Sequence, residues 1–213
     1  MTNNIRQRGK LALAQFKKYN GGLTREQWLF HEIRVAAKLQ TQGLSDAEIL
    51  TAVTENNLFQ FPTERMINNL TGVCLKRLNA LNNSELVRCI AESPVEIAKQ
   101  INVYAMMRHN QIVWDFMTTI IGEKYRTQDL SFQKKDLNLF FMYLREQDSD
   151  VAAWTPGTEV KIKQVLAKML LEAGFISSLK SGVLNPVYLY DELEQGIREN
   201  KDMDALPAFN CFR

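Results

Sequence analysis

The chain has 213 residues, of which 46% are hydrophobic and 23% are charged, and its 26 lysines and arginines nearly balance its 24 aspartates and glutamates. This composition is typical of a globular protein of one or two domains and excludes an intrinsically disordered chain. The longest stretches without a charged residue (66–75 and 181–190) are far shorter than the roughly 20 apolar residues of a membrane-spanning helix, so a transmembrane protein is excluded.

Positive charge is concentrated at the start of the chain. Residues 1–25 contain no acid and six cations, which are Arg6, Arg8, Lys10, Lys17, Lys18 and Arg25. A basic segment of this kind can lie along nucleic-acid phosphates or in a minor groove, although a solvated terminus has the same composition. We predict that Arg6, Arg8, Lys10, Lys17 and Lys18 form a DNA-binding arm. No apolar signal segment follows these residues, so we expect a cytoplasmic protein.

Helix-start signals recur along the first half of the chain. Thr24–Gln27 and Ser45–Glu48 each have the capping-box spacing, in which a hydroxyl caps the first turn and a Glu or Gln three residues later bonds back. The first predicts a helix that ends at Gly43, and the second a helix to about Asn56. Thr63 begins a longer helix that Asn82 and Asn83 end, and Ser84 starts a short one.

The second half continues the helical pattern. Ser93-Pro94-Val95-Glu96 combines a cap with proline at the first helical position, and it predicts a helix to Arg108. Further helices are expected over 111–124 and 131–146. Thr155-Pro156 repeats the cap and proline for a long helix that ends at Ala173, with Gly174 as a left-handed terminator.

The pattern changes after residue 174. Apolar runs at 175–179 and 183–188 flank Lys180-Ser181-Gly182, which predicts a short β-hairpin before a last helix over 191–200. The fold class is therefore all-α, with two packed helical bundles and one hairpin. In the absence of a linker, we place the domain boundary near Ser93, which gives an N-terminal bundle (1–92) and a C-terminal bundle (93–213).

Residues 131–200 have the element order of the second half of a winged helix-turn-helix, in which the last helix enters the major groove and the hairpin contacts phosphate. On the long helix, an apolar stripe is separate from a polar face that bears no acid, formed by Thr158, Lys161, Gln164 and Lys168. We predict that the lysines and Lys180 bind phosphates and that Gln164 and Thr158 lie near bases or sugars. A merely solvated helix face is the alternative.

Signatures of catalysis are absent from the sequence. His31 and His109 are isolated, and the three cysteines lack the spacing of a zinc site or a disulfide framework. No phosphate-binding loop, dinucleotide fingerprint or hydrolase elbow occurs. We therefore predict a protein that is not an enzyme and has no cofactor or metal.

Several segments together resemble the BrxA family of BREX bacteriophage-exclusion systems over nearly the whole chain. They are Tyr19-Asn-Gly-Gly-Leu23, the Glu26–Ala37 segment, Ile101–Asp115 with Tyr104 and Arg108, Trp154-Thr-Pro-Gly-Thr158, Lys163-Gln-Val-Leu166 and Leu170-Leu-Glu-Ala-Gly-Phe-Ile176. The resemblance implies a helical, non-enzymatic protein that binds duplex DNA beside other BREX proteins, including the methyltransferase. Architecture similar to the NusB antitermination factor is also implied, which keeps RNA binding open.

A different class of function also fits the sequence. The acidic last helix and the apolar tail that follows it, with Leu206, Phe209 and Phe212, would suit a scaffold that docks onto another subunit. The leading hypothesis remains a DNA-binding accessory protein that contacts mainly phosphates.

Overall fold

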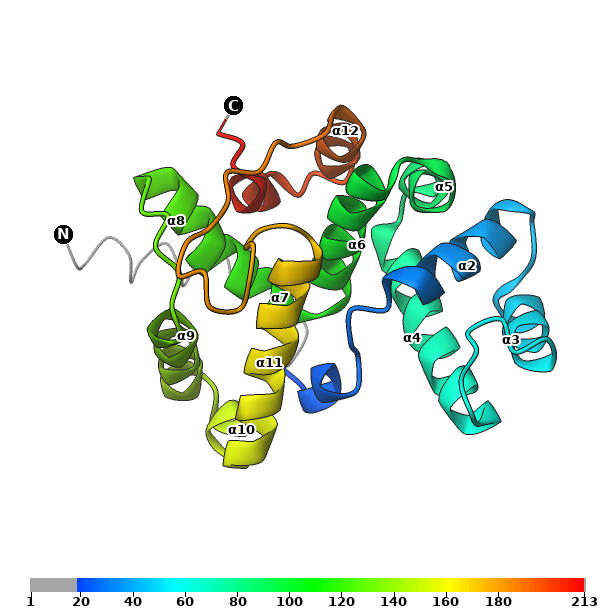
Figure 1. Cartoon of the computed structure of the whole chain (residues 1–213), viewed down its shortest axis with the longest axis horizontal. Coiled ribbons are helices and arrows are strands. Elements are labelled where there is room, and N and C mark those ends of the chain that lie inside the picture. The colour runs from blue at the N-terminus through cyan, green and yellow to red at the C-terminus, as the bar shows by residue number, and fades with distance from the viewer. Residues whose placement is uncertain (1–18, 213) are drawn as a thin grey trace.

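The structure is a computed structural model that describes residues 19–212. The predicted arm residues Arg6, Arg8, Lys10, Lys17 and Lys18 lie outside this part. The described chain is mostly helical (Figure 1), in agreement with the predicted all-α class. Its elements are η2 (Gly21–Thr24), α2 (Phe30–Thr41), α3 (Asp46–Glu55), α4 (Glu64–Leu81), α5 (Ser84–Glu92), α6 (Val95–His109), α7 (Gln111–Asp115), η3 (Phe116–Ile121), α8 (Gly122–Thr127), α9 (Lys134–Gln147), α10 (Ser149–Ala152), α11 (Pro156–Glu172), α12 (Asp191–Glu199) and η4 (Met203–Phe209).

Local capping sets several of these helix ends. Ser45 and Glu48 form the predicted capping box at the start of α3, and the Thr63 side chain caps α4. Thr155 caps α11 with Pro156 at its first position, and Gly174 follows with a φ of +80°. These helices begin where the sequence predicts because each cap needs only partners within four residues.

The prediction that a helix begins with a capping box at Thr24–Gln27 is wrong. A short 3₁₀ turn, η2, ends at Thr24, and α2 begins only at Phe30, after Leu29 adopts a left-handed φ of 51°. The carbonyl groups of Glu26 and Gln27 accept hydrogen bonds from Arg77 instead of from a following helical turn. A contact from about fifty residues away therefore keeps this segment out of the helix.

Two helix details also differ from the prediction. Pro94, not Ser93, occupies the cap position of α6, and no side chain caps that end. The predicted 111–124 helix is interrupted by η3, a π-helical segment. Wider helical turns of this kind leave backbone groups that side chains can satisfy, and Thr118 and Thr119 donate to the carbonyls of the preceding turn.

The predicted hairpin and winged helix-turn-helix are not present in the described structure. Residues 175–190 form an irregular loop whose one bridge joins Val183 to Ser131, outside any strand. The backbone N–H of Asn185 donates to Phe175, and its side chain donates to Gly174. These contacts tie the loop to the end of α11 and to residue 131. The Asn185–Phe175 bond joins the two apolar runs at one point, but no strand pairing forms between them within the described residues.

The helix α6 lies at the centre of the molecule. It is buried on all its faces from Gln100 to Met107, and it packs against α4, α5 and α7. In Figure 1, α2, α3 and α4 lie to its right and α8 to α11 to its left. One cluster of buried side chains runs from Leu23 to Phe209 and crosses the residue 93 boundary, so the division into 1–92 and 93–213 stays a prediction.

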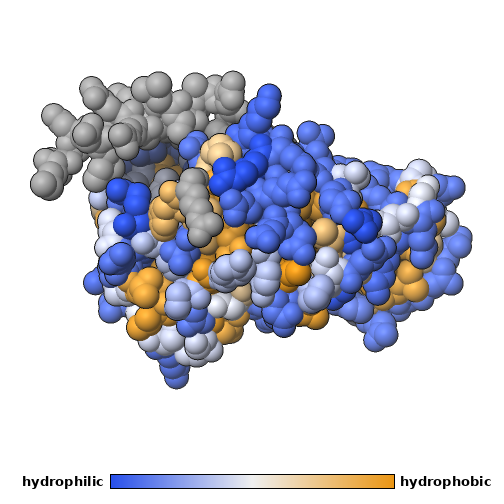
Figure 2. Space-filling view, turned by 90° about the horizontal axis from the view of Figure 1, so that it is seen from above, coloured by the Kyte–Doolittle hydropathy of each residue, from blue (hydrophilic) through white to orange (hydrophobic). Residues whose placement is uncertain are grey.

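The face seen from above in Figure 2 is mainly polar. Seen from above, hydrophilic residues dominate the face and hydrophobic ones form small groups between them (Figure 2). None of the helices between residues 19 and 212 has the length and hydropathy that crossing a membrane would require. In the tail, Leu206 and Phe209 are buried and Phe212 is exposed, so the expectation that all three form a docking tail was wrong for the first two.

Two helical glycines give opposite predictions for stability. A Cβ at Gly196 on α12 would lie 2.6–2.7 Å from the buried side chain of Leu86 on α5. We expect Gly196→Ala to lower the free energy of unfolding by about 1–3 kcal/mol because α12 must move away from α5. Gly72 in α4 has no atom within 4 Å of such a Cβ, so Gly72→Ala should stabilise the chain by about 0.5–1 kcal/mol. Urea unfolding of both variants tests this pair, and equal effects would contradict it.

Candidate nucleic-acid interface

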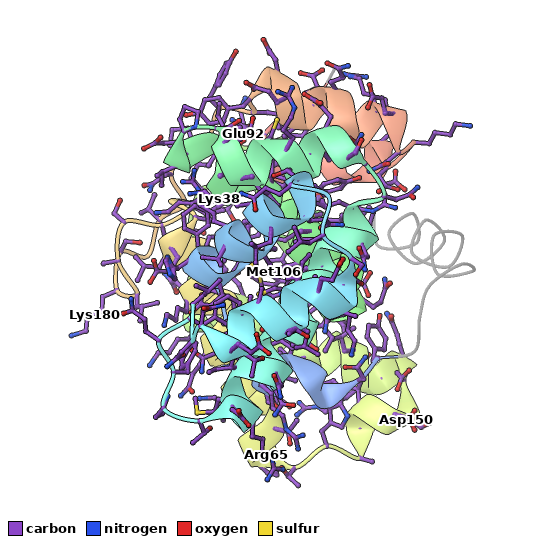
Figure 3. All side chains as sticks on the ribbon, turned by 90° about the vertical axis from the view of Figure 1, so that its right-hand side faces the viewer. Lys38, Arg65, Glu92, Met106, Asp150 and Lys180 are labelled. Atoms are coloured by element: carbon purple, nitrogen blue, oxygen red, sulfur yellow. The ribbon has the colours of Figure 1, made fainter. Side chains whose placement is uncertain are left out.

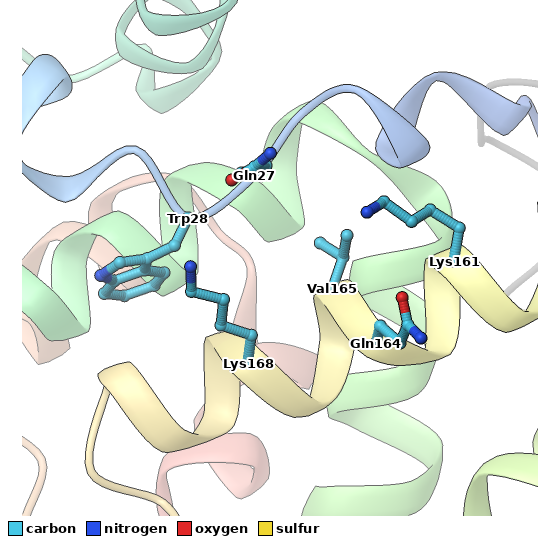
Figure 4. A pocket seen from close by; sticks show the side chains of 6 residues that line it. All are labelled: Gln27, Trp28, Lys161, Gln164, Val165 and Lys168. Atoms are coloured by element: carbon cyan, nitrogen blue, oxygen red, sulfur yellow. The ribbon is translucent and has the colours of Figure 1, made fainter.

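The predicted polar face of α11 lies along a groove of about 190 Å³ (Figure 4). Three of its four predicted residues, Lys161, Gln164 and Lys168, line the groove together with Val165. The opposite wall is formed by Gln27 and Trp28, in the segment between η2 and α2. The groove therefore joins two parts of the chain that are more than a hundred residues apart in sequence.

The groove is electropositive. Lys161 and Lys168 are exposed, and none of the described residues that line the groove is acidic. The helix α11 carries two acids, Glu159 and Glu172, and neither lines the groove. The Glu159 carboxylate contacts Arg145 on α9 at 2.7 Å and Lys163 on α11 at 2.5 Å. Neither Lys161 nor Lys168 forms an ion pair within residues 19–212, so no direct carboxylate partner compensates their charge.

The other predicted residues lie elsewhere. Thr158 bonds to the Thr155 hydroxyl at 3.0 Å, and its methyl group packs 3.5 Å from where a Cβ would lie on Gly21. Lys180 is exposed on the 175–190 loop and projects from the edge of the molecule (Figure 3), but it does not line the groove. Thr158 thus supports η2, and the structure does not bring Lys180 together with the other predicted residues.

A buried arginine, Arg77, forms hydrogen bonds to the backbone of the wall opposite α11. The Arg77 guanidinium on α4 donates to the carbonyl groups of Glu26 at 3.1 Å, Gln27 at 2.8 Å and Trp28 at 3.2 Å. Asn102 on α6 also donates to Trp28, at 3.0 Å. Both side chains are fully buried. These four bonds fix the backbone of the wall in a non-helical course.

Burying Arg77 is costly for the fold. Burial lowers the pKa of its guanidinium because a charge in the interior loses its hydration. The Nε atom has no hydrogen-bond partner, and no carboxylate of the described chain forms an ion pair with the side chain. The three carbonyl groups are its compensation, since backbone dipoles stabilise a buried cation when they point their oxygens at it.

Glu26, which precedes the wall residues Gln27 and Trp28 and does not line the groove, contacts His109 on α6, with its carboxylate 3.1 Å from Nε2. Burial raises the pKa of the Glu26 carboxyl, but the contact with His109 and the charges of His109 and Arg77 hold the pKa below its ordinary value of 4.5. Because the folded chain favours the ionised form, this carboxylate stabilises the fold above that value. The contribution is lost as the pH falls through the lower pKa of the folded state.

We therefore expect Glu26→Gln to reduce the acid sensitivity of the fold. The wild type should lose more stability than Glu26→Gln between about pH 6 and about pH 3. Urea unfolding midpoints measured across this interval check the prediction. Parallel pH curves for the two proteins would show that Glu26 does not contribute.

The first described residue, Tyr19, is anchored by a side-chain hydrogen bond, and the chain that follows it passes the start of α11. The Tyr19 hydroxyl donates to Asp115 at 2.5 Å, and Gln111 donates to the other oxygen of this carboxylate at 2.8 Å. Burial raises the pKa of the Asp115 carboxyl, and burial with the nearby carboxylate raises the pKa of Tyr19. From this anchor, Gly21 passes beside Thr158 at the start of α11. The point at which residues 1–18 join the described chain thus lies near one end of the groove.

Comparison with known proteins decides the family. The model of the BrxA family matches residues 17–201, which is most of the chain. The chain belongs to the BrxA family of BREX phage-defence systems. This confirms the resemblance seen in the sequence.

Three BrxA-family relatives support the assignment, each named BREX protein BrxA. The relative from Bacillus cereus (strain H3081.97) is 28% identical over 162 residues, which cover 76% of this chain and 80% of the relative. The relative from Paramagnetospirillum magneticum is 21% identical over 171 residues (80% and 85%). The relative from Escherichia coli O9:H4 (strain HS) is 22% identical over 190 residues (89% of each).

A solved structure has the same fold as this BrxA-family chain. It is the crystal structure of an uncharacterised protein from Magnetospirillum magneticum, with a TM-score of 0.78. The similarity covers 91% of this chain and 98% of that one, at 19% sequence identity. The two proteins therefore share their helical architecture over the matched part of this chain.

Two BrxA-like residues of the sequence, Tyr104 and Arg108, are structural. Both contact the Asp202 carboxylate, Tyr104 through its hydroxyl at 2.6 Å and Arg108 through an ion pair. Asn200 donates to the Tyr104 hydroxyl at 3.1 Å and to the carbonyl group of Leu81 at 2.8 Å. This network ties the chain after α12 to α4 and α6, and it lies apart from the residues that line the groove.

The described part of the BrxA-family chain contains no group of three or more His, Cys, Asp or Glu that could hold a metal ion. Cys74 is fully buried, and burial raises the pKa of its thiol to about 12. A thiol with so high a pKa is a poor nucleophile at neutral pH. The predicted absence of a cofactor or metal for the whole chain stays a prediction.

Proposed function

We propose that this BrxA-family chain is a non-enzymatic accessory protein of a BREX system that binds duplex DNA mainly through phosphate contacts. The observation that supports the proposal is the pair of exposed, uncompensated lysines, Lys161 and Lys168, on either side of Gln164 along the groove. Ammonium groups bind phosphate oxygens, and an amide can contact a base edge.

The spacing and size of the groove suit a polymer. Lys161 and Lys168 are seven residues apart on α11, which places them about 10 Å apart along the helix axis and allows contacts to separate phosphates. A cavity of about 190 Å³ is smaller than the roughly 300–1,000 Å³ of typical small-molecule sites. The groove would therefore admit part of a larger ligand more readily than a whole metabolite or cofactor.

The sequence before Tyr19 adds to this argument. It carries Arg6, Arg8, Lys10, Lys17 and Lys18 without any acid, and it joins the described chain near the start of α11. Cations attached at this point can add phosphate contacts beside those of Lys161 and Lys168. Other BREX proteins, including the methyltransferase, are the proposed protein partners.

The salt dependence of duplex binding tests the proposal. If five to six phosphates are engaged, the logarithm of the association constant should fall with the logarithm of salt concentration at a slope of about −4.5 to −5.5. Gel shifts or fluorescence anisotropy with a labelled duplex across a salt series give this slope. A flat response, or no binding at low salt, would overturn the proposal.

Competition separates DNA from RNA as the ligand. Duplex DNA, single-stranded DNA and single-stranded RNA compete for the labelled duplex at one fixed salt concentration. We expect duplex DNA to be the strongest competitor. If RNA competes better, the NusB-like alternative replaces the DNA proposal.

A further inference from the structure

We propose that Gln27 and Gln164 form a two-sided base-reading site, in which the segment before α2 and the helix α11 contact the same stretch of DNA. The inference rests on the proposed DNA-binding function and deepens it. It assigns to Gln27 a role in choosing the DNA sequence, which the salt-dependent phosphate contacts cannot provide.

Both amides are available for a ligand. Gln27 and Gln164 are exposed and line the groove from opposite walls (Figure 4), and within the described chain neither side chain makes a hydrogen bond. Each amide carries a donor and an acceptor, so it can form the two-bond contact with the N6 and N7 atoms of adenine. The neighbouring lysines can only donate, which suits them to phosphate oxygens.

The position of Gln27 is fixed before any ligand arrives. Its own carbonyl group accepts a 2.8 Å hydrogen bond from Arg77, and the carbonyl groups of Glu26 and Trp28 on either side are also held by Arg77. The Trp28 ring is 7% exposed and packs into the core beneath the wall. A backbone held in this way does not have to be ordered on binding, so less of the contact energy is lost to entropy.

This arrangement gives the buried Arg77 a functional consequence. The same bonds that prevent residues 26–29 from forming a helix leave Gln27 in a segment that lines the groove opposite α11, rather than on the surface of α2. In a continuous helix, Gln27 would follow the helical periodicity of α2 and would not face Gln164 across a groove. The buried Arg77 thus maintains the second wall of the site, although burying its charge costs free energy.

The experiment compares two duplexes of equal length. A preferred duplex is first selected by the wild type from a pool with a randomised central segment, and its affinity is measured beside that of a scrambled duplex. A good amide–adenine contact discriminates by roughly 5- to 150-fold. We expect Gln27→Ala to lower the ratio of the two affinities at least fivefold, without a change in scrambled-duplex affinity or salt slope.

Matched variants complete the design. Gln42→Ala removes an exposed amide at the end of α2, away from the groove, and should leave the ratio unchanged. Gln164→Ala should lower the ratio as Gln27→Ala does, and the double variant should lose less than the product of the two single effects if both amides contact one base pair. Circular dichroism of each variant verifies that the fold is retained.

Each outcome has one meaning. An unchanged ratio for Gln27→Ala, or a wild type that selects no preferred duplex while still binding DNA with a steep salt slope, overturns the reading site and leaves the proposed function intact. A wild type that binds neither duplex at low salt overturns the proposed function itself.

Discussion

Replacing Arg77 by alanine should lower the free energy of unfolding by about 3–5 kcal/mol. The substitution removes the donor for the carbonyl groups of Glu26 and Gln27, while Trp28 keeps its bond from Asn102. Each buried acceptor left without a partner costs about 1–3 kcal/mol, and the lost side chain leaves a cavity beneath the wall. Both effects act on a fully buried position, where the structure relaxes only partly.

A control on the same helix isolates this effect. Arg65 lies on α4 about three turns before Arg77, and it is exposed. Arg65→Ala should change the free energy of unfolding by less than about 0.5 kcal/mol. Urea unfolding followed by circular dichroism measures both variants. If they are equally stable, the hydrogen bonds from Arg77 to the wall contribute nothing net to the fold.

Arg77 also explains which helix starts could be predicted. The predicted caps at Ser45, Thr63 and Thr155 are confirmed because a hydroxyl and a backbone N–H three residues later decide them, with the Glu48 carboxylate bonding back at Ser45 alone. Thr24–Gln27 has the same local spacing, yet its carbonyl groups bond to a guanidinium from another helix. A spacing rule considers only hydrogen bonds between residues that are close in sequence. It cannot predict that the fold will place the Arg77 guanidinium beside these carbonyl groups.

The loop after α11 is a second segment that local sequence signals do not predict correctly. Two apolar runs around Lys180–Gly182 are typical of a hairpin, but Val183 pairs with Ser131 and Gln100 bonds to the backbone of Tyr188 and Tyr190. Apart from the single Asn185–Phe175 bond, the extended chain therefore pairs with the distant segment around Ser131 and with a side chain of the central helix. Turn chemistry can predict a reversal of the chain, whereas pairing depends on which donors and acceptors the fold places nearby.

About half of the groove could be predicted from the sequence. Helical spacing alone places Lys161, Gln164 and Lys168 on one face of α11, and the structure brings all three to one groove. Gln27 and Trp28 were missed because the second wall comes from a segment predicted to be helical. The available signal was weak: Arg77 occurs among the apolar positions of α4, and a buried arginine needs acceptors from another part of the chain.

Removing Lys161 and Lys168 together should flatten the salt dependence of DNA binding. Each lysine that neutralises a phosphate contributes about −0.9 to the slope, so Lys161→Ala/Lys168→Ala should reduce its magnitude by about 1.8. At about 0.1 M salt this corresponds to a loss of affinity of roughly 60-fold. Both side chains are exposed and form no ion pair in the described chain, so the fold should retain its stability.

The matched control removes the same charge elsewhere. Lys38 on α2 and Arg65 on α4 are exposed and lie outside the groove (Figure 3), and within residues 19–212 their side chains have no ion-pair partner. Beyond a Debye length of about 10 Å, exposed charges are largely screened, so Lys38→Ala/Arg65→Ala should leave the slope nearly unchanged. If the two double variants flatten the slope equally, binding follows net charge alone and the groove is not the contact surface. If only the groove variant does so, phosphates bind at Lys161 and Lys168.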